Sequence, residues 1–160
     1  MNKEIILHLI IDALQRDLSA LQKAVKLAHD SATHGESKAE NKYDTRGLEA
    51  SYLAHGQSQR AAEIAISLMS YQRLEGALLV NNDRVAVNSL VKLLDGEGET
   101  RWLWLGAEAG GLKVSCGADN VTVVTPHSPL GKALLGKMAG DEVMIKLQEV
   151  LHEYEIVDLY

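Results

Sequence analysis

The N-terminal half of the chain carries a seven-residue apolar repeat, and this repeat limits the fold more than any other feature. Apolar positions in a first segment alternate in steps of four and three: Leu7, Ile11, Leu14, Leu18, Leu21, Val25, Ala28 and Ala32. A second segment continues the same spacing: Tyr43, Gly47, Ala50, Ala54, Gln57, Ala61, Ile64, Leu68 and Tyr71. This is the a/d stripe of a coiled coil. A competing stripe in the second segment leaves its register open: Leu48, Tyr52 and Leu53.

The break between the two segments predicts a helical hairpin. Gly35 stands where a left-handed residue would end the first helix, so we expect the turn at residues 33–37. Two helices joined by a tight turn must run antiparallel. We expect the hairpin to cover about residues 4–73, with helices of roughly 30 residues and a length of about 45 Å.

Beyond Leu74 the apolar period changes from seven residues to two. The runs "RVAV", "SLVKLL", "RWLWLG", "GLKV" and "NVTVVTP" are rich in β-forming residues and are separated by turn signals. Ser128 is a natural N-cap with Pro129 at the first helical position, so a short helix is expected there. The runs "DEVMIKL" and "HEYEIVDLY" predict two closing strands. The fold class is therefore α+β, with a helical hairpin over residues 1–75 and a small β domain over residues 76–160.

Composition narrows the classes of function. The formal net charge of −6 argues against a dedicated surface for duplex DNA, which needs clustered Lys and Arg. No run approaches the ~20 apolar residues of a membrane span. The single cysteine, Cys116, excludes an internal disulfide framework and fits a reducing compartment. We therefore expect a cytoplasmic protein that has no contact with a membrane.

Two segments resemble the GreA/GreB family of bacterial transcript-cleavage factors. The segment "SPLGKALLGKMAGDEV", residues 128–143, is similar to the family signature S-P-x-x-x-x-L-x-G-K followed by an acidic pair. The segment "HGESKAENKYD", residues 34–44, is similar to the family's hairpin tip. The resemblance implies an antiparallel coiled coil followed by an FKBP-like β domain. It also implies a partner, RNA polymerase, whose secondary channel the hairpin enters toward the nascent RNA 3′ end.

The resemblance further implies that the chain is not an enzyme on its own. Two acids at the tip of such factors hold a second Mg²⁺ in the polymerase active site, where two metals activate water and stabilise both oxygens of the displacement. Matching Gly35 and Tyr43 without a gap places Glu36 on the first of these acids and Ala39 on the second. The nearest acid to the second position is Glu40. Glu36 and Glu40 are therefore the candidate catalytic and metal-binding residues, and no cofactor of the chain's own is implied.

Glu40 also has a purely structural explanation. Ser37 and Glu40 have the spacing of a capping box, in which each side chain satisfies a main-chain N–H at the helix start. Since the second acid is displaced, two mechanisms stay open. Either the tip supports Mg²⁺-dependent cleavage of backtracked RNA, or it occupies the channel and regulates transcription without cleavage.

The resemblance assigns a docking role to the corner formed by His127, Ser128 and Pro129, which contacts the rim of the polymerase channel in the family. His127 departs from the usual Asp or Asn at its position. The alternative is that Ser128 and Pro129 only start the short helix.

Two other classes of function remain as alternatives. The chain could be an interaction module for an assembly other than polymerase, or a thiol enzyme built from Cys116, Asp119 and His127. The spacing of His29, His34 and His55 matches no zinc signature. Trp102 and Trp104 alternate along one strand, which indicates packing rather than base stacking.

Overall fold

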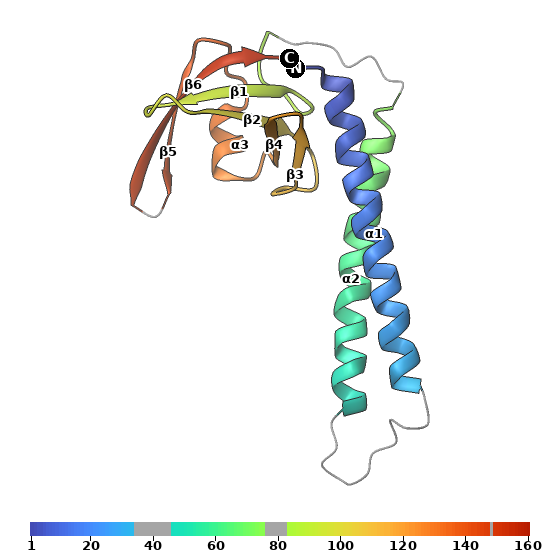
Figure 1. Cartoon of the computed structure of the whole chain (residues 1–160). Helices are drawn as coiled ribbons and strands as arrows, with labels where there is room; N and C mark the ends of the chain where they lie inside the picture. The colour runs from blue at the N-terminus through green and yellow to red at the C-terminus, as the bar shows by residue number, and fades with distance from the viewer. Residues whose placement is uncertain (34–45, 76–82, 148) are drawn as a thin grey trace. The chain divides into compact units, whose positions relative to one another are not determined.

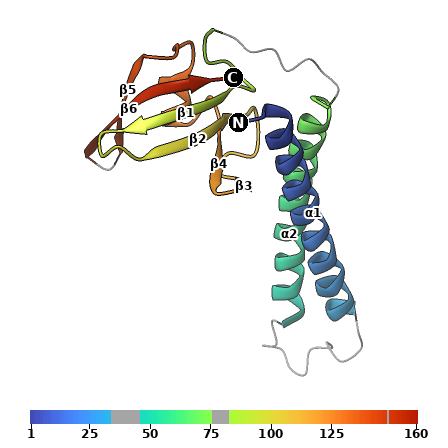
Figure 2. The same ribbon diagram turned by 45° about the horizontal axis from the view of Figure 1, so that its top comes forward.

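The structure, a computed structural model, describes residues 1–33, 46–75, 83–147 and 149–160. Two long helices come first, α1 (Lys3–Thr33) and α2 (Arg46–Gln72). Six strands and a short helix follow: β1 (Leu90–Asp95), β2 (Thr100–Leu105), β3 (Lys113–Cys116), β4 (Asp119–Val124), α3 (Pro129–Leu134), β5 (Glu142–Leu147) and β6 (Val150–Leu159). Both views show α1 and α2 side by side (Figures 1 and 2). The predicted α+β class, with a helical hairpin before a β domain, is confirmed.

The predicted apolar stripe is the buried face of the helices. Along α1, Leu7, Ile11 and Leu14 are buried, and the stripe positions from Leu18 to Ala28 are half-buried. On α2, Ile64 and Tyr71 are buried, which fits the same spacing. The competing stripe is wrong at the two positions where its exposure is described, because Tyr52 and Leu53 are 70% and 58% exposed. The predicted turn at residues 33–37 lies almost wholly outside the described residues.

The chain divides into two compact units, and the base of the helices belongs with the sheet. The first unit contains residues 1–11 and 70–160, and the second contains residues 12–69. Ile6 and Ile10 of the first unit are fully buried, although neither lies on the predicted stripe. The base of α1 thus buries a second apolar face. The predicted boundary between residues 75 and 76 stays a prediction, because residues 76–82 lie outside the described part.

The sheet is mixed, with the strand order β3-β4-β2-β1-β6-β5. Every neighbouring pair is antiparallel except β2 and β4, which run parallel and align Trp102 with Val121 and Trp104 with Val123. One face of the sheet contributes most of the core: Val91, Leu93, Leu103, Leu105, Val143, Ile145, Tyr154 and Ile156. Val85, which lies outside the strands, and Leu134 of α3 belong to the same core. Trp102 and Trp104 alternate with Leu103 and are buried on the opposite face, as a packing role requires.

One predicted strand is wrong. The run "RVAV", residues 84–87, has the alternation of a strand, yet it belongs to no strand of the sheet. Its main chain instead bonds to the turn after α3: Val85 N–H donates to Lys137 O at 2.7 Å, and Gly136 N–H donates to Val85 O at 2.8 Å. Two isolated bonds satisfy the backbone without a ladder, and burial of Val85 alone explains the apolar pattern. The other predicted strands and the helix at Ser128 are present.

Candidate functional site

The corner between β4 and α3 is built by the Ser128 side chain. Ser128 has an extended backbone, with φ −69° and ψ 154°, and it is the N-cap of α3. Its Oγ accepts from Gly131 N–H at 3.0 Å, which satisfies one of the free amides of the first helical turn. The same hydroxyl donates to the Thr125 carbonyl oxygen at 2.7 Å. Ser128 therefore ties the helix start to the end of β4.

Gly131 makes this corner tight. A Cβ at residue 131 would collide with the Thr125 carbonyl oxygen, which is the group that Ser128 also contacts. Because that obstacle is main chain, a side chain at residue 131 would push the helix away from β4. The glycine at residue 131 is thus explained by close approach, whereas the signature glycine, Gly136, has a positive φ of 79° that favours glycine.

The residues of the corner that are exposed to solvent are not the residue that holds the corner together. His127 and Pro129 are exposed, whereas Ser128 is half-buried and both functions of its hydroxyl are engaged within the chain. The structural explanation of Ser128 is therefore supported, and any contact with a partner falls mainly to His127 and Pro129. The docking role itself stays a prediction.

Glu36 and Glu40, with Gly35, Ser37 and Ala39, lie outside the described residues. Their roles as catalytic and Mg²⁺-binding residues therefore stay predictions. Across the described part of the chain, no three His, Cys, Asp or Glu side chains are grouped so that they could hold a metal ion.

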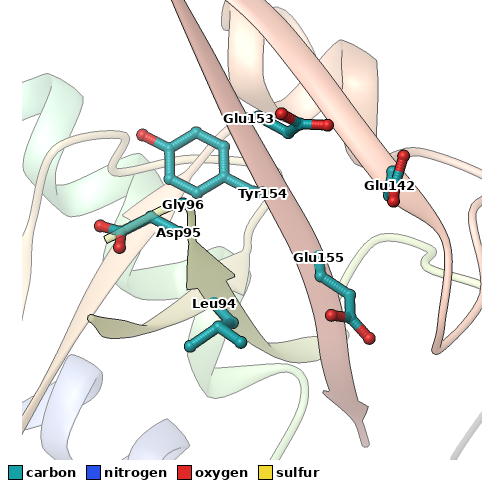
Figure 3. Close-up of a pocket in the computed structure, with 7 residues that line it drawn as sticks. All are labelled: Leu94, Asp95, Gly96, Glu142, Glu153, Tyr154 and Glu155. Atoms are coloured by element: carbon teal, nitrogen blue, oxygen red, sulfur yellow. The ribbon is translucent and has the colours of Figure 1, made fainter. Parts of the chain in front are cut away.

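An acidic hollow of about 170 Å³ lies beside β5 and β6 (Figure 3), and it resembles a metal site at first sight. Glu142 and Glu155 are paired directly across the two strands, and Glu153 also lines the hollow. Asp95 is already used: its carboxylate accepts from the amides of Glu97 and Glu99, and it lies 3.5 Å from the Arg101 guanidinium. Figure 3 shows the carboxylates spread around the hollow rather than aimed at one point. The hollow is an acidic surface and not a metal centre.

The structure argues against the thiol enzyme. Cys116 faces Asp119 across the β3–β4 pair, at the start of β4. His127 follows the other end of that strand, and five residue steps of about 3.3 Å put the two ends roughly 17 Å apart. The imidazole cannot reach the thiol over that span. The thiol hypothesis is therefore rejected.

A family comparison decides the identity of the chain. The family described as "Transcription elongation factor, GreA/GreB, C-term" matches residues 80–160, which include the corner and the whole sheet. The chain belongs to the GreA/GreB family. It is a transcription elongation factor of that family, and the predicted family membership is confirmed.

Individual relatives of this GreA/GreB member are distant. Transcription elongation factor GreA of Helicobacter hepaticus is 27% identical over 128 residues, covering 80% of this chain and 72% of that protein. GreA of Chlorobaculum tepidum is 27% identical over 157 residues, covering 96% and 87%. Among solved structures, GreA factor homolog 1 of Thermus thermophilus matches with a TM-score of 0.38 and 22% identity, covering 94% of each chain.

The GreA/GreB member has no helix among its described residues that is long and apolar enough to cross a membrane.

Proposed function

We propose that this GreA/GreB factor binds RNA polymerase, with its β domain at the rim of the secondary channel and its helical hairpin inside the channel. The observation that carries the proposal is the corner at Ser128, which combines the family's Ser-Pro signature with two exposed residues, His127 and Pro129. A rigid corner suits docking because little side-chain entropy is lost when it is covered.

The hairpin tip then acts within the polymerase active centre, so the factor is not an enzyme by itself. Carboxylate oxygens are the donors that Mg²⁺ prefers in proteins, and Glu36 and Glu40 supply two of them near the tip. A Mg²⁺ shared with polymerase would lower the pKa of a bound water at the RNA 3′ end. The chain's own contribution is to bring negative charge to that place.

A second mode competes with cleavage, and Ala39 is the observation that favours it. Ala39 stands where the family has its second acid, and one carboxylate holds Mg²⁺ less well than two when water competes. In this mode the hairpin occupies the channel and alters polymerase catalysis without cutting RNA.

One experiment separates these modes. A stalled, backtracked elongation complex is incubated with the factor, and the transcript length is followed on a sequencing gel. Shortened transcripts support cleavage. Unchanged transcripts, together with binding of the factor to core polymerase in a pull-down, support channel occupation. Absence of binding to core polymerase would contradict the whole proposal and favour a module for another assembly.

A further inference from the structure

β5 is one of the two edge strands of the sheet. The strand order places β5 at one end, beside β6 alone, and β3 at the other end (Figure 1). β5 has six residues, whereas β3 has four. An edge strand presents a row of N–H and C=O groups with which a strand of another chain can pair. β5 presents the longer of the two rows.

Every second residue of β5 directs its main-chain groups to this outer side. The carbonyl oxygen of Asp141 accepts from the Ile156 amide of β6 at 3.0 Å, so it faces into the sheet. The next carbonyl oxygen, that of Glu142, accepts instead from the Lys137 ammonium at 3.4 Å. Successive residues of a strand point their main-chain groups to opposite sides. The outward row therefore consists of residues 142, 144 and 146.

The side chains of these three residues lie on one face of the strand and are exposed. They are an acid, an apolar residue and a base: Glu142, Met144 and Lys146. Met144 is 61% exposed, whereas Val143 and Ile145 between them are buried in the core. The core thus holds β5 from its other face. The order acid, apolar, base is complementary to itself when a second copy runs in the opposite direction.

The charges of the row are poorly matched within one chain. Glu142 lies directly across from Glu155 of β6, and like charges in that position destabilise a sheet. No salt bridge among the described residues includes Glu142. Lys146 lies across from the apolar Leu151, and its ammonium contacts the Glu149 carboxylate at 2.6 Å, three residues away. Both side chains of that pair are exposed, so the contact is weak and Lys146 can exchange it for another carboxylate.

We propose that β5 pairs with β5 of a second copy of this chain, antiparallel and centred on Met144. This register places Glu142 across from Lys146 of the second copy, and the twofold symmetry repeats the pair. About six main-chain hydrogen bonds join the two edges, one of which replaces the long bond from Lys137. The Lys146 ammonium of the second copy also relieves the repulsion between Glu142 and Glu155. Since the interface is small, the association is weak and depends on protein concentration.

Charge reversals test the register, because each contact joins unlike charges. Glu142→Lys places lysine across from lysine, and Lys146→Glu places acid across from acid. Either change should weaken self-association about tenfold or more at low salt, and by less at high salt. An equimolar mixture of the two variants should associate again, because each lysine of one variant then faces a glutamate of the other. The double variant Glu142→Lys/Lys146→Glu should associate like the wild type.

Sedimentation velocity at rising protein concentration measures these associations for the full chain, without polymerase. Glu97→Lys and Lys113→Glu are the matched controls, because they make the same charge changes at exposed positions outside β5. Lys113 belongs to β3, so its variant also tests the other edge of the sheet. Both controls should associate like the wild type. The melting temperature of each variant is checked first.

The inference goes beyond the proposed function, and the two can fail separately. A wild type that stays monomeric at every concentration would overturn the pairing of β5 and would not affect binding to polymerase. Self-association that both reversals leave unchanged, or a mixture that does not associate although each single variant has lost association, would exclude this register. A monomeric wild type whose polymerase binding is weakened by Glu142→Lys, but not by Glu97→Lys, would assign the edge to a polymerase strand instead.

Discussion

The phenolic hydroxyl of Tyr71, near the end of α2, donates a hydrogen bond to the main-chain carbonyl oxygen of Glu108, with 2.9 Å between the two oxygens. The tyrosine is only 2% exposed, and its partner lies 37 residues further along the chain. Gly106, directly after β2, leaves room for this hydroxyl, since a Cβ at residue 106 would collide with it. The end of α2 is thus joined to the sheet through a bond that needs both a tyrosine and a glycine.

We expect Gly106→Ala to destabilise the protein by about 1–3 kcal/mol, because a methyl group forced into a filled space displaces its neighbours. The displaced atom is the tip of the Tyr71 side chain, so removing that hydroxyl should make room. Tyr71→Phe alone should cost about 1 kcal/mol through the lost hydrogen bond. Urea unfolding measures both changes.

The double variant Gly106→Ala/Tyr71→Phe provides the control. If the two residues compete for one space, the double variant should be more stable than the sum of the two single costs predicts. Strict additivity would mean that the methyl group collides with something other than the hydroxyl. The requirement for glycine at residue 106 would then need another explanation.

Alkaline pH should lower the free energy of unfolding through the same Tyr71 hydroxyl. Burial raises the pKa of Tyr71 above its ordinary value of about 10, and the negative charge of Glu108 raises it further. Above pH 10 the unfolded chain loses the Tyr71 proton while the folded chain keeps it, so the free energy of unfolding falls as pH rises. Below pH 10 this contribution is fully present. Unfolding curves from pH 8 to 11 should fall more steeply for the wild type than for Tyr71→Phe, and equal slopes would exclude the effect.

The Ser128 corner should separate docking from stability. The double variant Ser128→Asn/Pro129→Ala keeps a good N-cap and a good residue for the first helical turn, so its melting temperature should stay near that of the wild type. Its binding to core polymerase should be weaker, because the exposed Pro129 ring is lost. Ser128→Ala is the comparison: loss of the cap should cost about 1 kcal/mol in stability. A double variant that binds normally would reduce the corner to a helix start.

The features that the sequence predicts correctly are local. The four-three spacing from Leu7 to Leu14 predicts a buried helical face because side chains seven residues apart meet on one side of a helix. The cap at Ser128 was equally predictable, because the hydroxyl and the amide that it satisfies are three residues apart. Such signals need no knowledge of the remaining fold.

The features that the sequence does not predict depend on long-range contacts. Alternation at Val85 and Val87 is the same whether a segment joins a ladder or bonds twice to a distant turn, so the pattern of "RVAV" predicts a strand that the fold does not form. The second buried face at Ile6 and Ile10 depends on long-range contacts, because residues 1–11 form one compact unit with residues 70–160. The partnership of Tyr71 with Glu108 has no local signature at all.

The hairpin tip gives the sharpest test of the cleavage mode. Glu36→Gln keeps the shape of the side chain and removes its charge, so it should abolish cleavage of a backtracked transcript while binding to polymerase is preserved. Glu40→Gln tests charge alone, because Gln also serves in a capping box. A loss from both changes would assign both carboxylates to Mg²⁺, whereas a loss only at Glu36 would leave Glu40 as a cap.

Ala39→Glu completes the tip series by restoring an acid at the family's second acidic position. A second carboxylate should strengthen the hold on a shared Mg²⁺, because a hard cation gains from each added oxygen donor. Cleavage by the wild type should therefore be weak, and Ala39→Glu should raise its rate while polymerase affinity stays unchanged. The matched control is Ala39→Gln, which adds a side chain of the same shape without charge and should leave the rate low. If the wild type, Ala39→Glu and Glu36→Gln all bind polymerase and leave the backtracked transcript uncut, the cleavage mode is wrong, and the factor regulates polymerase by occupying its channel.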